Sequence, residues 1–173
     1  NQRLRQSASP RREASATNRH AARPRFTKRE VLERRVAGLL LRFSQELSSE
    51  WANFGSEDFT QPMLRELMGQ ASALASANQL NIQRLAEMSP RLLPEIELLV
   101  FAVENELSFM TDWKLDDLKK SFLGEFRIEL LKSRMREIHS QIRQAETIGR
   151  LSEAKSLSAQ FNDLSKELSR YAV

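Results

Sequence analysis

The sequence has no cysteine among its 173 residues, and it has only five glycines, five prolines and one tyrosine. Without cysteine the chain can form neither a disulfide framework nor a thiolate metal site, so we expect a reducing compartment, with the cytoplasm as the default. The longest apolar stretch, LLPEIELLVFAV, is interrupted by Glu95 and Glu97. It falls short of the roughly 18 apolar residues of a membrane-spanning helix, and we therefore expect a core helix and no membrane partner.

The N-terminal end is equally informative about what is missing. The chain does not begin with methionine, and its first residues lack the apolar centre of a signal peptide. We therefore expect that it is part of a longer protein.

Positive charge is concentrated at the N-terminus. Residues 1–29 hold nine lysines or arginines and a single acid, Glu13, giving +8, whereas the remaining 18 bases and 22 acids give −4. Residues 1–26 contain Pro10 and Pro24, much serine and alanine, and few side chains that could be buried, so they are predicted to be a disordered basic linker. Two functions stay open for this linker, a solvated tether and a weak contact with nucleic acid phosphates.

The next hundred residues show helical signals and no convincing strand. The motif TKRE pairs Thr27 with Glu30 as a capping box, and the apolar spacing that follows predicts a helix from 28 to 49. Pro62 suits the first turn of a second helix, and further helices are expected over 79–88 and from Pro94 to about 110. The fold class is therefore all-α, with a compact helical bundle over 27–124.

The last third follows a different pattern, in which apolar residues alternate strictly between spacings of three and four. Two such stripes joined by a turn containing Gly149 predict an antiparallel two-helix hairpin over 125–173, with Gly149 ending the first helix and Ser152 capping the second. A kink near Gly124 and a continuous helix over 116–145 both remain open. The residues expected in the seam between the two helices are Ile138, Ile142, Leu157, Phe161, Leu164 and Leu168.

Residues that could carry catalysis are scarce. His139 stands among arginines without a carboxylate or cysteine at ligand spacing, and Asp116 and Asp117 are typical of a helix first turn. Neither a glycine-rich phosphate loop nor a serine with a histidine partner is present, so we expect no enzyme activity, cofactor or metal in this chain. The aromatic residues near position 55 are expected to pack in the core rather than to stack on bases: Trp51, Phe54 and Phe59.

The order of these parts resembles a known family. A Pro/Arg/Ser-rich linker, a bundle opening with RRVAGLLLRFSQELS, and a closing GRLSEAKSLSAQFNDLSKEL together resemble the C-terminal helicase-binding domain of bacterial DNA primase. In that family the last helix follows a Gly-Leu-Ser turn, and this sequence has one residue inserted after Gly149. The resemblance covers residues 27–173.

The resemblance implies a function in DNA replication. It implies a protein-interaction domain that docks on the N-terminal collar of the replicative DNA helicase and couples RNA primer synthesis to the replication fork, as part of the primosome. The catalytic and zinc-binding domains of the primase would lie upstream. In the same family a basic pocket near the first helix can receive the acidic tail of the single-stranded-DNA-binding protein, and Arg29, Arg34 and Arg35 are its candidates here.

Apolar residues beyond the needs of the seam are candidates for the helicase contact, namely Ile148 and Leu151 at the hairpin tip and Tyr171 near its end. Two other classes of function are also compatible with the sequence. One is a nucleic-acid-binding helical protein that acts through its basic N-terminal arm. The other is a structural coiled-coil dimer formed through the last helix.

Overall fold

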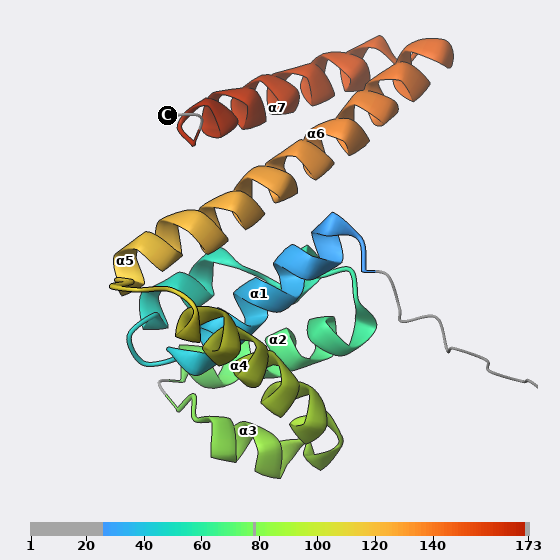
Figure 1. The fold of residues 1–173 in the computed structure, drawn as a ribbon. Helices are drawn as coiled ribbons and strands as arrows, with labels where there is room; N and C mark the ends of the chain where they lie inside the picture. The colour runs from blue at the N-terminus through green and yellow to red at the C-terminus, as the bar shows by residue number, and fades with distance from the viewer. Residues whose placement is uncertain (1–25, 78, 172–173) are drawn as a thin grey trace, which may run out of the picture.

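The computed structural model describes residues 26–77 and 79–171, so the predicted linker lies, apart from Phe26, outside the described residues. In this part of the chain every regular element is helical, and the prediction of an all-α fold is confirmed (Figure 1). The helices are α1 (Lys28–Arg42), α2 (Pro62–Ser76), α3 (Ile82–Met88), α4 (Leu93–Ser108), α5 (Leu115–Leu118), α6 (Gly124–Thr147) and α7 (Leu151–Ser169). Shorter 3₁₀ and π turns are η1 (Ser48–Asn53), η2 (Ser56–Asp58), η3 (Pro90–Leu92) and η4 (Lys119–Leu123).

Helix α1 begins as the sequence predicts and ends earlier. The Thr27 backbone N–H donates to Glu30 Oε2 at 2.7 Å, and the Glu30 N–H donates to Thr27 Oγ1 at 3.2 Å, which completes the capping box. Hydrogen bonds to the Glu30 carboxyl, first from the Thr27 backbone and then from the Thr27 side chain, hold its pKa below its usual value.

The predicted extension of this helix to residue 49 is wrong, because α1 ends at Arg42 and turns follow. Phe43, Leu47 and Trp51 nevertheless remain buried at their spacing of four. The Leu47 N–H donates to the Phe43 carbonyl at 2.8 Å, so a turn followed by the 3₁₀ segment η1 also directs these side chains inward. Apolar spacing fixed which residues are buried here, but not the backbone conformation that buries them.

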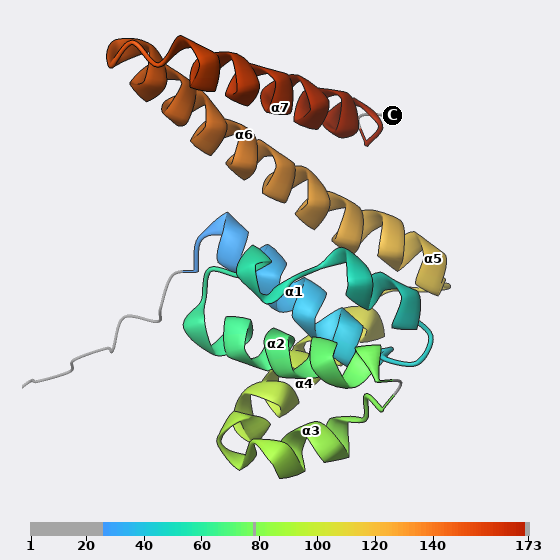
Figure 2. The same cartoon turned by 180° about the vertical axis from the view of Figure 1, so that it is seen from behind.

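The bundle is organised around the crossing of α1 and α4 (Figures 1 and 2). At the crossing, a Cβ placed on Gly38 would lie 2.6 Å from the Leu99 carbonyl oxygen and 2.7 Å from Val103 Cγ2, so only glycine permits this close approach. Helices α2 and α3 pack beside this pair and complete the core. The largest fully buried side chains are Phe59, Phe126, Leu39, Leu40, Leu41, Leu47, Leu64, Leu67, Met68, Leu85, Leu92 and Ile96.

One helical run leaves the bundle. Helix α5, the π turn η4 and helix α6 follow one another without a break from Leu115 to Thr147. Gly124 has helical φ and ψ angles of −63° and −49° and does not interrupt the run. Acids occupy the first turn of α5, as predicted from Asp116 and Asp117.

The first half of this run belongs to the bundle core. Leu118, Phe122, Phe126 and Leu130 are buried in the same cluster as the residues of α1, α2 and α4. The bundle therefore continues to about residue 130, beyond the predicted limit at 124.

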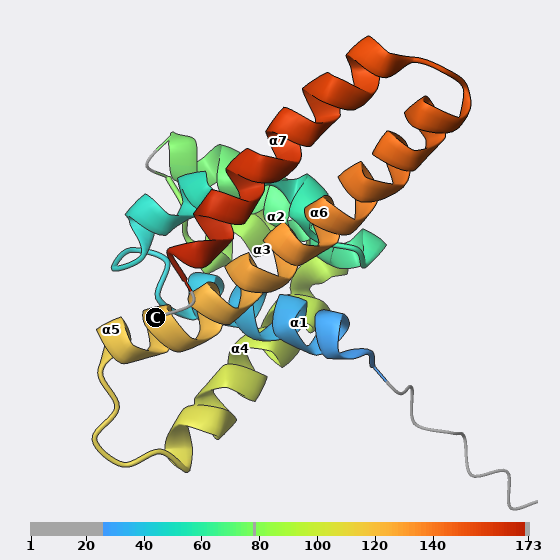
Figure 3. The ribbon, with the colours of Figure 1, turned by 90° about the horizontal axis from the view of Figure 1, so that it is seen from above.

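Beyond the bundle, α6 and α7 lie side by side and run in opposite directions (Figure 3). Gly149 has a φ of +77°, the Gly149 N–H donates to the Glu146 carbonyl at 3.1 Å, and the Arg150 N–H donates to the Ala145 carbonyl at 2.8 Å. This is a Schellman turn, and it confirms that Gly149 ends the first helix.

The predicted cap at Ser152 is wrong. Helix α7 begins at Leu151 with Arg150 in the N-cap position, and no side chain caps it. The Schellman turn delivers the chain directly into the next helix, so Ser152 already lies inside the first turn.

Candidate partner-binding surface of the hairpin

The seam between α6 and α7 is closed near the tip. Ala145 and Ala154 are buried, with 3% and 6% of their surface exposed. Such small side chains allow two helices to approach closely. Farther from the tip, the six predicted seam residues are all only half-buried: Ile138, Ile142, Leu157, Phe161, Leu164 and Leu168.

Two open grooves run along this seam. The first, which we call the basic groove, has a volume of about 460 Å³ and is lined by Lys132, Met135, Arg136, His139, Phe161 and Leu168. The second, which we call the mixed groove, has a volume of about 480 Å³ and is lined by Arg134, Glu137, Ile138, Gln141, Gln160, Asp163 and Leu164. The hairpin thus presents apolar side chains on two sides, with different charges around each.

Ion pairs fix the hairpin to the bundle at several points. Arg134 of α6 donates to the buried carboxylate of Asp58 at 2.7 Å. Arg127 donates to the Asn53 carbonyl at 2.9 Å and to Glu167 of α7 at 3.0 Å, so it joins both hairpin helices to η1. These contacts hold α6 at a defined angle to the bundle.

A further ion pair ties the start of the long helical run to η1. Lys119 lies 2.9 Å from Glu50. The hydrogen bond from Lys119 holds the pKa of the Glu50 carboxyl below its usual value, and the same bond raises the pKa of the Lys119 ammonium group. Each group therefore favours the charged form of the other.

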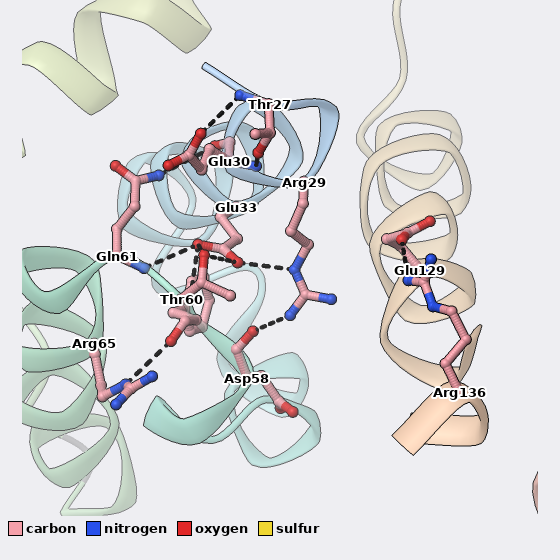
Figure 4. Close-up of polar contacts among 11 residues, drawn as sticks. Thr27, Arg29, Glu30, Glu33, Asp58, Thr60, Gln61, Arg65, Glu129 and Arg136 are labelled. Carbon is pink, nitrogen blue, oxygen red and sulfur yellow. Dashed lines mark hydrogen bonds and ion pairs between the residues drawn. The ribbon is translucent and has the colours of Figure 1, made fainter. Parts of the chain in front are cut away.

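Glu33 of α1 is a fully buried charge, and it is completely partnered (Figure 4). Its carboxylate accepts from Arg29 Nε at 2.8 Å, from the Thr60 N–H and hydroxyl at 2.9 Å, and from the Gln61 N–H at 3.4 Å. Because Thr60 and Gln61 immediately precede α2, this carboxylate fixes the start of α2 against α1. A buried charge of this kind stabilises the fold only with all its partners in place.

Arg29, Arg34 and Arg35, the predicted acidic-peptide pocket, all have carboxylate partners in the same chain. Arg34 lies 2.6 Å from Glu95, and Arg35 is paired with Glu106 of α4. Arg29 is paired with Glu33 as described above. An acidic tail would have to displace these carboxylates, and the pocket stays a prediction.

The three predicted helicase-binding residues do not form one surface. Ile148 and Leu151 project at the tip, with 55% and 73% of their surface exposed. Tyr171 follows the other end of α7, about 30 Å away at 1.5 Å per residue. There it is 41% exposed and lines a cavity of about 320 Å³ with Glu50 and Arg127, against the bundle.

Sequence reasoning missed exposed apolar residues on α4 and at its C-cap. Leu98, Phe101 and Phe109 are 52%, 65% and 82% exposed. The segment LLVFAV is apolar on every side of a helix, whereas α1 and the rest of the bundle cover only one side of α4. An excess of apolar residues over what one face can bury is the signal that could have identified them.

The remaining predicted residues lie as expected. Trp51, Phe54 and Phe59 are buried, which confirms that they pack in the core. Two tilted aromatic pairs join them to α6, since Phe126 lies 5.6 Å from Phe54 and 5.4 Å from Phe59 between ring centroids. His139 is exposed at the basic groove.

The described part of the chain offers no group of three or more histidines and acids that could hold a metal ion. Over the same residues, the helices lack the length and apolar character that a membrane crossing demands. Comparisons with protein-family models, with curated proteins and with solved structures found no match to this chain.

Proposed function

We propose that this chain is the protein-interaction domain of a bacterial DNA primase and that its hairpin docks on the N-terminal domain of the replicative helicase. The observation that supports the proposal is the open hairpin, whose seam is half-buried and whose tip exposes Ile148 and Leu151. A hairpin that served only its own fold would gain stability by burying these side chains. The primase-like order of linker, bundle and closing Gly-Leu-Ser-type turn supplies the identity of the partner.

The contacts at the base of the hairpin are suited to a docking element. Arg134 and Arg127 join it to the bundle, so the tip stands at a fixed place while its apolar side chains remain free to bind. Binding to a pre-organised surface loses less conformational entropy than binding to a mobile one.

The direct test is calorimetric titration of the N-terminal domain of a bacterial replicative helicase with the full chain and with a Leu151→Ala variant. Loss of an exposed apolar contact at the centre of an interface costs about 1–2 kcal/mol, so we expect binding to weaken about tenfold. Ile148→Ala should behave similarly. Point variants are preferable to a truncation at Gly124, because Phe126 and Leu130 belong to the bundle core.

Leu98→Ala is the matched control, since Leu98 is an exposed leucine on α4 of the bundle. It should leave the affinity unchanged. If Leu151→Ala and Leu98→Ala bind equally well, the tip is not part of the interface. If the unchanged chain does not bind at tens of micromolar, helicase docking is excluded, and the basic N-terminal arm and nucleic acid become the next hypothesis.

A further inference from the structure

The two grooves of the hairpin differ in charge although they have similar volumes. The basic groove is lined by three basic or ionisable side chains of α6 and by no acid, namely Lys132, Arg136 and His139. The mixed groove carries Glu137 and Asp163 beside Arg134, and that arginine is already paired with Asp58 of the bundle. The charge of the basic groove is therefore a feature of one side of the hairpin and not of the whole surface.

The basic side chains form a regular stripe along α6. Lys132, Arg136, His139 and Arg143 follow one another at steps of four, three and four residues, and all four are exposed. Residues at these steps share one face of a helix, and the stripe is about 16 Å long at 1.5 Å per residue. Arg136 is paired with Glu129 at 3.0 Å (Figure 4), but its side chain is 70% exposed, and such surface pairs are weak enough to be exchanged.

Apolar side chains lie beside this stripe. Met135, Phe161 and Leu168 line the same groove and are only half-buried by the hairpin itself. Phe161 and Leu168 are seven residues apart on α7, which places them on one face two turns apart. The groove therefore offers an apolar floor with a row of positive charge along one wall.

Both walls of the groove are α-helices, whose interior backbone N–H and C=O groups are already paired. An extended peptide would gain no main-chain hydrogen bonds here and would leave its own groups unpaired. A helix satisfies its backbone internally and repeats its side chains every three to four residues, as both walls of the groove do.

We propose that the basic groove holds an amphipathic helix of a partner protein, with its apolar stripe against Phe161 and Leu168 and its carboxylates along Lys132, Arg136 and His139. This inference rests on the proposed docking function of the hairpin and adds the chemistry of the partner. The apolar floor favours a protein helix over nucleic acid, because phosphates gain nothing from Met135, Phe161 and Leu168.

The probes are two synthetic amphipathic peptides of about 20 residues, long enough to form a helix that spans the groove. Both carry leucines at helical spacing, flanked by glutamates in one peptide and by lysines in the other. Fluorescence anisotropy measures their binding to the full chain. We expect saturable binding of the glutamate peptide and at least tenfold weaker binding of the lysine peptide.

A doubly substituted variant, Lys132→Glu with His139→Glu, should weaken binding of the glutamate peptide at least tenfold. The matched control is Lys155→Glu, because Lys155 is an exposed lysine of α7 next to the buried Ala154 and lines neither groove. It should change the affinity less than twofold. Circular dichroism checks that the variants remain helical, and Lys132→Gln, which removes charge without reversing it, should give an intermediate loss.

Equal binding of the two peptides, absence of binding, or equal affinities of the double variant and the control would each overturn the proposal. So would tighter, competing binding of a single-stranded oligonucleotide that the double variant abolishes, since the stripe would then be a phosphate site. Self-association of the unchanged chain that the double variant abolishes would make a second copy the occupant. If the peptides fail while Leu151→Ala still weakens helicase binding, the groove proposal falls and the docking function stands.

Discussion

The bundle and the hairpin bury their apolar residues to very different extents. In the bundle, α1 alone contributes Val36, Leu39, Leu40 and Leu41 with no exposed surface, and even the charge of Glu33 is fully enclosed and partnered. Beyond Leu130, the hairpin helices α6 and α7 bury only Leu131, Ala145 and Ala154, and the six predicted seam residues are half-buried. The bundle therefore has a closed hydrophobic core, whereas the hairpin leaves apolar surface accessible to another molecule.

The largest expected effect is on the free energy of unfolding, and it differs between a phenylalanine of the bundle and one of the hairpin. Phe126 is fully buried in the bundle core, and Phe126→Ala should lower the free energy of unfolding by about 3–5 kcal/mol. The sequence alone predicts a similar loss for Phe161 if it is fully buried, but it is only half-buried, so Phe161→Ala should cost about 1–2 kcal/mol. Urea denaturation measures both. Equal losses would mean that the hairpin seam is as closed as the bundle.

Two glycines provide the next comparison. Gly38→Ala places a methyl group against the Leu99 carbonyl and Val103, so it should destabilise the bundle by about 1–3 kcal/mol. Gly124 lies in the long helical run with open space around its Cβ position. Gly124→Ala should stabilise the chain by up to about 1 kcal/mol. Thermal unfolding measures the change in stability of each variant. If Gly38→Ala stabilised the chain, the close crossing of α1 and α4 would be refuted.

The smallest expected effect concerns the contact between the long helical run and η1. The pKa of Glu50 is lowered from 4.5 by Lys119, so its contribution to stability is present above that value and lost as the pH falls through the lowered pKa. The pKa of Lys119 is raised from 10.5, so its contribution is present below 10.5 and lost as the pH rises through the raised pKa.

Glu50→Gln should therefore lower Tm by about 1 °C at pH 7 and by less at pH 2, because the Glu50 carboxyl loses its charge as the pH falls through its lowered pKa. Differential scanning calorimetry at the two pH values measures this difference. A loss of the same size at pH 2 would show that packing, rather than charge, is what Glu50 contributes.

The fold was largely predictable because its signals are local. The capping box at Thr27, Pro62 in a first turn and Gly149 at a helix end each depend on a few neighbouring residues, and the structure confirms all three. The end of α1 was not predictable from apolar spacing. Phe43 and Leu47 are buried because their side chains point inward, and a turn can achieve this as well as an α-helix. Likewise, the assignment of Phe126 to the bundle depends on its contacts with Phe54 and Phe59, about 70 residues away.

The candidate surface was predictable only in part. Apolar residues outside a coiled-coil stripe identified the exposed tip pair, Ile148 and Leu151, but could not show that Tyr171 lies at the opposite end of the hairpin. The three arginines of α1 have the right charge for an acidic peptide. Arg34 and Arg35, however, are paired with carboxylates on α4 that lie 61 and 71 residues away in the chain, and spacing alone does not reveal such pairs. Arg29 is paired with Glu33 of its own helix.

The uninterrupted helical run from the bundle core to the hairpin gives the molecule a mechanical property. From Leu130, the last residue of α6 in the bundle core, to Thr147 at the tip the helix extends about 26 Å at 1.5 Å per residue. It acts as a lever arm that pivots where it leaves the bundle core, at Leu130. A tilt of about 10° at this pivot would carry Ile148 and Leu151 through about 4–5 Å, so a small repacking within the bundle becomes a large displacement of whatever the tip holds.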